Sequence, residues 1–387
     1  MKEHIRQRGK TWTYVVDVGR REDGRRWQVT KGGFKTQRAA RAAARKLLVS
    51  NEESGIYTPP AKERVGPFLE RWLDSVRATV RPSTHAMYET LVEKQLVPAI
   101  GNVELQRLTA SRLNGMYADL LANGRRDGKG GLSPETVRKV HITIRKALNA
   151  AVKWGDLRRN VADDADPPPK GQAGAKLRTW TAGELAHFLD FVRGDRLYAA
   201  YLLLATTGLR RGELLGVRRG DLDLEAGRLS LVQTVITVNY EVKFSAPKTA
   251  RGRRSVALDA TTIATLREHR TRQVAERTAL GLPWPSADDL AFARPDRAPI
   301  HPDGFSNRFD RLVAGSGLPR ITVHDLRHTH ATLALQAGVN PKVVSERLGH
   351  ATVGITLDTY SHVGAVLEEE AAERVASLVF QGAEPAR

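Results

Sequence analysis

Near the N-terminus, hydrophobic and polar positions alternate in two short runs and then change to a helical spacing. The runs 13–18 and 26–30 are rich in Val, Thr, Tyr and Trp, and Asp23 and Gly24 between them form a typical hairpin turn. Over 37–50, small and apolar residues recur every three to four positions, as on one face of a helix. This pattern predicts a small ββ(β)α module at the start of the chain.

The next part of the chain, 56–162, has the spacing of amphipathic helices and no strand-like alternation. Four helices are predicted, and the last of them, from Ser133 to about Trp154, carries a continuous apolar stripe. The acidic residues and the three successive prolines that follow do not continue a helix. A stiff linker is therefore expected over 163–175.

Helical and strand-like patterns are mixed in the last part, 176–387. Thr181 and Glu184 have the spacing of a capping box, and the run 198–206 is apolar throughout, as in a buried helix. Strands are expected after it, the longest of them over 228–238, where β-branched residues gather. The predicted fold class is multidomain and mainly α with small β elements, and it ends in a mixed α+β domain.

Composition adds the class of partner. Lys and Arg number 61 against 43 Asp and Glu, which gives a formal net charge of +18 and a pI of about 10.3. Such an excess on folded domains favours a polyanionic partner. The chain has no cysteine, which excludes disulfides and thiolate metal sites, and it has no long apolar run. We expect a cytoplasmic protein that does not contact membranes.

Two groups of basic residues are placed to contact nucleic acid. The first lies on the N-terminal hairpin, where it would enter a groove, and a solvated surface is the alternative for this group. The second lies largely off the apolar stripe of the helix 133–154. The candidate DNA-binding residues are Arg20, Arg21, Arg25, Arg26, Lys31, Arg138, Lys139, Arg145 and Lys146.

Several familiar catalytic sites are missing from the sequence. It contains no Gly-Lys-Ser/Thr phosphate loop and no His-Glu-x-x-His motif. His324 and His328 have the spacing of two metal ligands on a helix, yet no cysteine or carboxylate completes a ligand set. We therefore predict neither a metal nor a cofactor.

Arginine and histidine gather in the last domain instead. Arg210 follows Gly208 at the predicted start of a helix, where free backbone N–H groups favour an anion, and Glu213 is one turn further on. His324 and Arg327 share a helix face and reach the same anion. A surface Arg–Glu pair is the alternative for the first set.

Three further residues carry no clear meaning when each is taken alone. Lys248 lies in a turn between two predicted strands, His350 follows Leu348-Gly349, and Tyr360 stands in Thr359-Tyr360-Ser361-His362. Each has an ordinary alternative, which is a solvated loop lysine, a structural histidine or a packed tyrosine.

Taken in order, these residues resemble the active site of the tyrosine recombinase (phage integrase) family. The family strings T-G-L-R, H-D-L-R-H, L-G-H and D-T-Y-S-H all occur, together with a lysine between strands. The resemblance implies an arm-type DNA-binding domain over 1–55, a helical core-binding (SAM-like) domain over 56–162, and a catalytic domain of tyrosine recombinase type over 176–387.

The resemblance also implies a mechanism. Tyr360 is the nucleophile that cuts DNA and forms a 3′-phosphotyrosyl link, and Arg210 and Arg327 clamp the phosphate oxygens. His324 is the candidate general base or hydrogen-bond partner of the phenol, and Lys248 is the candidate general acid. His350 would bond the phosphate, and Glu213 supports the arginines.

The partners implied by the resemblance are double-stranded DNA attachment sites, a homotetramer assembled on DNA, an excision or directionality factor and a host DNA-bending protein. The C-terminal tail after Tyr360 packs either on its own domain or on a neighbouring copy. Three other functions stay open, namely a type IB-like topoisomerase, a dimer-resolving recombinase and a non-catalytic DNA-binding regulator.

Overall fold

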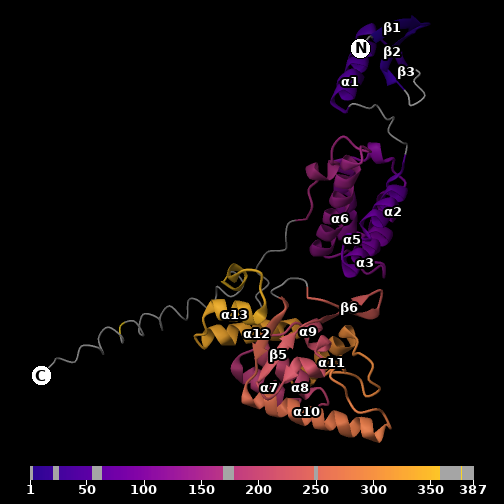
Figure 1. Cartoon of the computed structure of the whole chain (residues 1–387). Coiled ribbons are helices and arrows are strands. Elements are labelled where there is room, and N and C mark those ends of the chain that lie inside the picture. The colour runs from indigo at the N-terminus through magenta and orange to yellow at the C-terminus, as the bar shows by residue number, and fades with distance from the viewer. Residues whose placement is uncertain are drawn as a thin grey trace, which may run out of the picture. The chain divides into compact units, whose positions relative to one another are not determined.

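The computed structural model describes residues 3–20, 26–54, 63–168, 178–247 and 252–357, together with Ala376. The chain divides into two compact units (Figure 1). One comprises residues 1–75 and 91–168, and the other comprises 76–90 and 169–387. The predicted fold class is confirmed, because helices dominate and the strands form small antiparallel sheets.

The N-terminal module is a three-stranded antiparallel sheet followed by a helix. The strands β1 (Glu3–Arg8), β2 (Thr11–Arg20) and β3 (Arg26–Phe34) are paired in that order, and α1 (Gln37–Ser54) contacts β2. Ala40 and Ala44 of α1 and Tyr14 and Val16 of β2 are buried. The third strand, which the ββ(β)α prediction left open, precedes the other two. Ile5 is its single aliphatic residue, so its sequence carries little alternation.

The middle of the chain is helical, as predicted. Its elements are α2 (Val65–Val76), α3 (Pro82–Leu91), a π-helical turn (Val92–Leu96), α4 (Val97–Ile100), α5 (Ala110–Asn123) and α6 (Pro134–Lys153). Phe68, Leu69 and Trp72 of α2 are fully or almost fully buried, and so is the apolar stripe of α6. Ser133 caps α6 by accepting a hydrogen bond from the Thr136 amide.

The acidic residues after α6 fold back onto the helices. A short 3₁₀ helix (Val161–Asp164) is followed by an extended segment, and the Asp163 carboxylate lies 2.6 Å from Nε of Arg145. Asp166 and Asn114 bond each other twice, at 2.8 and 2.9 Å. Residues 169–177 lie outside the described ranges. The domain limits given above, with a linker over 163–175, stay predictions.

The last unit is built around the buried helix α8 (Tyr198–Thr207). Phe188, Phe305 and Phe309 pack against Tyr201 of α8, and Trp180 packs against Phe188 and Phe309 in the same aromatic core. The other helices are α7 (Ala182–Phe191), α9 (Arg211–Gly216), α10 (Ala260–Ala279), α11 (Pro302–Gly315), α12 (Val323–Gln336) and α13 (Pro341–Leu348). The predicted capping box of Thr181 and Glu184 is confirmed at the start of α7.

The strands of this unit form two separate sheets. The sheet β4 (Leu222–Asp223), β5 (Arg228–Leu231) and β8 (Arg254–Ala257) is distinct from the hairpin β6 (Thr234–Val238) and β7 (Glu241–Ser245). The prediction of one strand over 228–238 is therefore wrong. The chain leaves the first sheet at Val232 and Gln233, where Nε2 of Gln233 donates to the Gly216 carbonyl at 2.9 Å. No helix in the described ranges is long and apolar enough to span a membrane.

Candidate active site

Arg210 is placed by a glycine turn at the end of α8. Gly208 has a φ of 66°, in the left-handed region that glycine adopts without strain, and Leu209 behind it is buried. Arg210 is the residue that precedes the first turn of α9. The side chain is 42% exposed, which leaves it within reach of a ligand from solvent.

Glu213 is buried beneath Arg210 and holds it in two ways. Its carboxylate accepts from the Arg210 amide at 2.9 Å and from a terminal nitrogen of the Arg210 guanidinium at 2.7 Å. Burial alone would raise the pKa of Glu213, but hydrogen bonds and charge from Arg254, and then from Arg210, hold this pKa below its ordinary value. Glu213 is therefore an anion that fixes Arg210 on the protein.

Arg327 of α12 is 3% exposed, and backbone carbonyls bind it on two sides. One terminal nitrogen donates to the Gly208 carbonyl at 2.8 Å, and the other donates to the Leu348 carbonyl at 2.8 Å. The first carbonyl belongs to the turn before Arg210, and the second belongs to the end of α13. Arg327 therefore joins the two segments that flank the site.

The end of α13 faces both arginines. Gly349 has a φ of 69° and ends the helix, and its carbonyl accepts from Arg210 at 3.2 Å, next to the Leu348 carbonyl that accepts from Arg327. His350 follows directly. Its Nδ1 lies 2.8 Å from the hydroxyl of Thr356, a fully buried residue that fixes the ring. Arg210, Arg327 and His350 are thus gathered around one turn of the chain.

The histidines around this turn are held in the neutral form. Desolvation and the charges of Arg327 and Arg210 lower the pKa of His350 to about 4. His324 is an exposed residue in the first turn of α12, and its pKa lies below the ordinary value through desolvation and the charge of Arg327. Its ring meets that of His328 edge-on, with centroids 4.9 Å apart. A neutral imidazole can accept a proton, as a general base must.

Some predicted site residues lie outside the described ranges. These are Lys248, Tyr360, Arg21 and Arg25. Arg20 and Arg26 face each other in the register of β2 and β3, and their side chains are not described.

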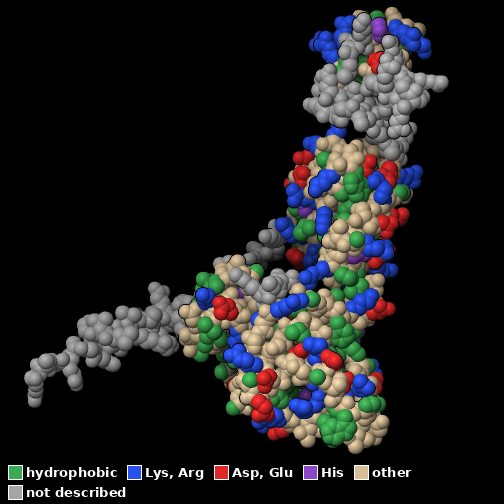
Figure 2. Space-filling model, viewed as in Figure 1, with side chains coloured by type: hydrophobic (Ala, Val, Ile, Leu, Met, Phe, Trp, Pro, Cys, Tyr) green, Lys and Arg blue, Asp and Glu red, His purple; other side chains and the backbone are tan. Residues whose placement is uncertain are grey.

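The remaining DNA-contact candidates are on the surface. Lys31, Lys139, Arg145 and Lys146 are exposed, and Arg138 is half-buried, with a hydrogen bond to the Pro168 carbonyl at 3.1 Å. Arg145 pairs with Asp163, and Lys139 lies 3.8 Å from Glu135. Lys and Arg side chains mix with Asp and Glu on the visible face of the helical region (Figure 2).

Sequence reasoning missed two residues that complete the site. Thr356 positions His350, and no local pattern indicates it. Arg254 of β8 donates to Glu213 through both terminal nitrogens, at 3.2 and 3.1 Å. A signal for Arg254 did exist, because strand alternation places it on the same face as the buried Val256.

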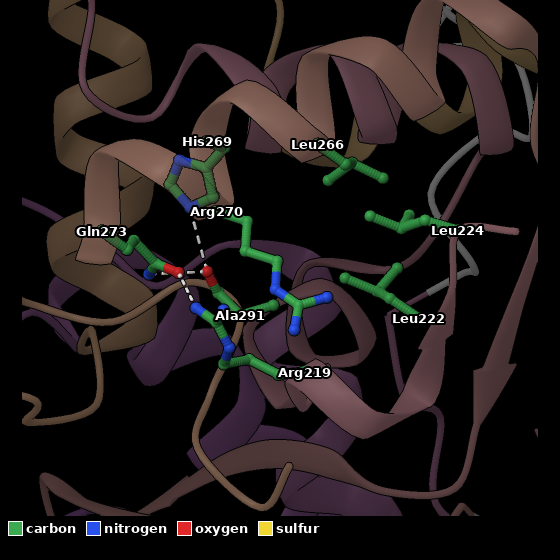
Figure 3. Close-up of a pocket in the computed structure, with 8 residues that line it drawn as sticks. All are labelled: Arg219, Leu222, Leu224, Leu266, His269, Arg270, Gln273 and Ala291. Carbon is green, nitrogen blue, oxygen red and sulfur yellow. Dashed lines mark hydrogen bonds between the residues drawn. The ribbon is translucent and has the colours of Figure 1, made fainter. Parts of the chain in front are cut away.

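A pocket elsewhere in this unit is separate from the candidate active site. It lies between α10 and the segments around Arg219 and Ala291 (Figure 3). His269 and Gln273 both donate to the backbone carbonyl of Ala291, and Arg219 donates to the side chain of Gln273. These groups stabilise the packing of α10, and none of the predicted catalytic residues lines the pocket.

Family models match three successive parts of the chain. The model of the phage integrase family matches residues 179–365, that of an arm DNA-binding domain matches 4–50, and that of a phage integrase N-terminal SAM-like domain matches 65–121. The matched regions follow the order predicted from the sequence.

Individual proteins are similar over most of their length. A tyrosine recombinase XerC-like protein of Caldanaerobacter subterraneus subsp. tengcongensis is 27% identical over 379 residues, which cover 94% of this chain and 95% of that protein. The integrase of the Tn1549 transposon, solved with transposon right end DNA, has a TM-score of 0.63 at 22% identity and covers 80% of this chain and 99% of its own.

A lambda integrase tetramer bound to a Holliday junction has a TM-score of 0.56 at 17% identity, and it covers 90% of this chain and 95% of its own. These structural likenesses concern the fold. Together with the three family models, which follow one another along the chain, they leave one assignment: the chain belongs to the phage integrase family of tyrosine recombinases and is a site-specific DNA recombinase.

Proposed function

We propose that this recombinase is the integrase of a phage or integrative element, and that it cuts and rejoins DNA through a 3′-phosphotyrosyl intermediate on Tyr360. The observation that carries the proposal is the gathering of Arg210, Arg327 and His350 around the turn at Gly349. Two guanidinium groups and a neutral imidazole on one turn suit a single phosphodiester.

In this proposal the phenol oxygen of Tyr360 attacks the scissile phosphorus in line with the 5′ oxygen. The bond from phosphorus to the phenol oxygen forms as the bond to the 5′ oxygen breaks. Because one phosphodiester replaces another, a 5′ hydroxyl of a partner strand reverses the step without an added energy source. Arg210 and Arg327 stabilise the charge that develops on the non-bridging oxygens.

Two proton transfers accompany the step. The phenol has an ordinary pKa of about 10, and His324 accepts its proton or shares it in a hydrogen bond. Lys248 gives a proton to the leaving 5′ oxygen. His350, fixed through Nδ1 by Thr356, bonds the phosphate through Nε2. Glu213 keeps Arg210 in place.

The partner in this proposal is double-stranded DNA carrying an attachment site. The arm-type domain over 1–55 contacts it through Arg20, Arg21, Arg25, Arg26 and Lys31, and the core-binding domain over 56–162 contacts it through the basic residues of α6. Four copies assemble on two such sites, in line with the tetramer that lambda integrase forms on a junction. A directionality factor and a host DNA-bending protein regulate the assembly, which acts on nucleoid DNA.

A covalent trap tests the proposal. The protein is incubated, in buffer containing EDTA, with a nicked suicide duplex. The duplex carries the junction sequence of the mobile element that encodes the protein, and the products are separated on a denaturing gel. We expect a DNA-linked band with the wild-type protein and none with Tyr360→Phe, which keeps DNA affinity. A band in the Tyr360→Phe lane would refute the nucleophile, and relaxation of supercoiled plasmid without an attachment site would favour a topoisomerase.

A further inference from the structure

Arg254 connects several parts of the candidate active site. It lies in β8, its side chain is 8% exposed, and both of its terminal nitrogens donate to the carboxylate of Glu213. Its Nε donates to the Arg347 carbonyl at 2.7 Å, within the last turn of α13. A single guanidinium therefore binds β8 both to the support of Arg210 and to the helix that presents Gly349 and His350.

The charges of Arg210 and Glu213 give a reason for the presence of Arg254. Glu213 is a buried anion, and its contact with Arg210 brings a full negative charge to 2.7 Å from that guanidinium. A pair of this kind has no net charge, so its attraction for a phosphate is weak. Arg254 adds a second positive charge to the same carboxylate. The triad of Arg210, Glu213 and Arg254 then keeps one net positive charge.

The hydrogen bonds of Glu213 also show that Arg254 shares the carboxylate with Arg210. Its two oxygens accept four donors, which are the Arg210 amide, one Arg210 guanidinium nitrogen and two Arg254 nitrogens. Arg254 donates to both carboxylate oxygens, and Arg210 donates to the carboxylate through only one of its terminal nitrogens. The other terminal nitrogen lies toward the Gly349 carbonyl at 3.2 Å, on the side of His350.

We propose that Arg254 is a positioning residue for strand cleavage: it neutralises Glu213, so that the positive charge of Arg210 acts on the scissile phosphate, and it fixes the end of α13 against the same group. This inference rests on the proposed function, since it concerns how the proposed phosphate site is made. Arg254 contacts neither the DNA nor the nucleophile.

The first test measures single-turnover formation of the covalent adduct at saturating suicide DNA. Arg254→Gln should reduce the rate about 10- to 100-fold, by analogy with the loss of a group that orients a metal ligand. Arg254→Lys keeps the charge without the fork of two donors and should recover part of the rate. Arg228→Gln, at an exposed position of the neighbouring strand β5, is the matched control and should cleave at the wild-type rate.

The second test separates charge from folding. A duplex with a methylphosphonate at the scissile position carries no negative charge at that group. Its cleavage therefore depends less on the positive charge of Arg210. The ratio of wild-type to Arg254→Gln rates should be at least several-fold smaller on this duplex than on the phosphate. A merely structural loss would reduce both rates by the same factor, and that result would overturn the inference, as would a wild-type rate for Arg254→Gln on the phosphate.

A double variant completes the test. If Arg254 neutralises Glu213, then removing the carboxylate as well, in Glu213→Gln with Arg254→Gln, should cleave faster than Arg254→Gln alone. A double variant that is slower than either single variant would contradict the inference. If the wild-type protein itself forms no Tyr360-dependent adduct, the proposed function fails instead, so the two failures are distinguishable.

Discussion

Two arginines of the candidate active site and three basic residues of α6 are similar side chains, but the first are buried and the second are exposed. Arg254 and Arg327 are buried, and carbonyls or a buried carboxylate hold each of them in place. Arg145, Lys139 and Lys146 are exposed. Arg145 pairs with Asp163 and Lys139 lies near Glu135, and both of these carboxylates are on the surface. A reaction at one phosphorus needs charges at fixed positions, whereas attraction to a duplex needs charges that reach many phosphates.

The largest effect is expected where a fixed arginine meets the reacting phosphate. Arg210→Ala removes a donor from the proposed transition state and should reduce adduct formation about 10²- to 10³-fold. Affinity for DNA should change little, because many other phosphate contacts remain. Single-turnover rates and a gel-shift titration measure the two effects.

The control for Arg210→Ala is the next residue. Arg211→Ala removes the same charge, but Arg211 bonds Ser306 and the Pro302 carbonyl rather than Glu213. Its adduct rate should stay within a few-fold of wild type. Equal losses in the two variants would mean that the region needs positive charge but no fixed arginine.

The backbone that holds these arginines is the next point to test. An alanine at Gly208 would be strained at φ 66°, and its Cβ would lie 2.5 Å from a Leu348 methyl and 2.8 Å from the His330 ring. We expect Gly208→Ala to lower the thermal midpoint and to reduce cleavage about 10- to 100-fold, because the Gly208 carbonyl holds Arg327. Gly317 has a φ of 72°, and an alanine Cβ at this position would have no atom within 4 Å. Gly317→Ala therefore strains the backbone without a steric clash and should keep the wild-type cleavage rate.

The sequence predicted the helices well, because the signals that start a helix are local. The capping box at Thr181 and the helix that begins after Ser133 are decided by residues within one turn. The break at Val232 and the role of Arg254 depend on contacts with distant segments, such as the Gly216 carbonyl or the end of α13. Such contacts have no signature in a single sequence, except that alternation in β8 turned Arg254 inward.

The half-buried His330 couples the packing beneath the Gly208 turn to pH. Nδ1 of His330 donates to the Ala205 carbonyl at 3.0 Å, and burial lowers the pKa of His330 to about 4. The unfolded chain, with an ordinary histidine pKa of about 6.5, binds a proton that the folded state does not. The free energy of unfolding should therefore be highest above pH 6.5 and should fall toward pH 4, with a contribution from His330 of up to about 2 kcal/mol between pH 7 and pH 5.

Urea unfolding at pH 7 and pH 5 measures that contribution. His330→Gln should show a smaller loss of stability on acidification than the wild-type protein, and the exposed His187→Gln should show the wild-type loss. If His330→Gln loses as much stability as wild type, the ring is not held neutral, and the packing under the Gly208 turn is looser than the contacts indicate.

The smallest effect per residue is expected on α6. Lys139→Ala with Lys146→Ala removes two exposed charges and should weaken DNA binding several-fold at moderate salt. The slope of log affinity against log salt should fall by about 2, since each phosphate contact contributes about 0.9. Cleavage at saturating DNA should be unchanged, because these side chains place no charge at the phosphorus. Arg193→Ala with Arg320→Ala, at positions 71% and 78% exposed on the catalytic unit, is the charge-matched control. A control with the same change in slope would assign the attraction to overall charge, and a cleavage defect at saturation would show that α6 also orients the DNA on the fixed arginines.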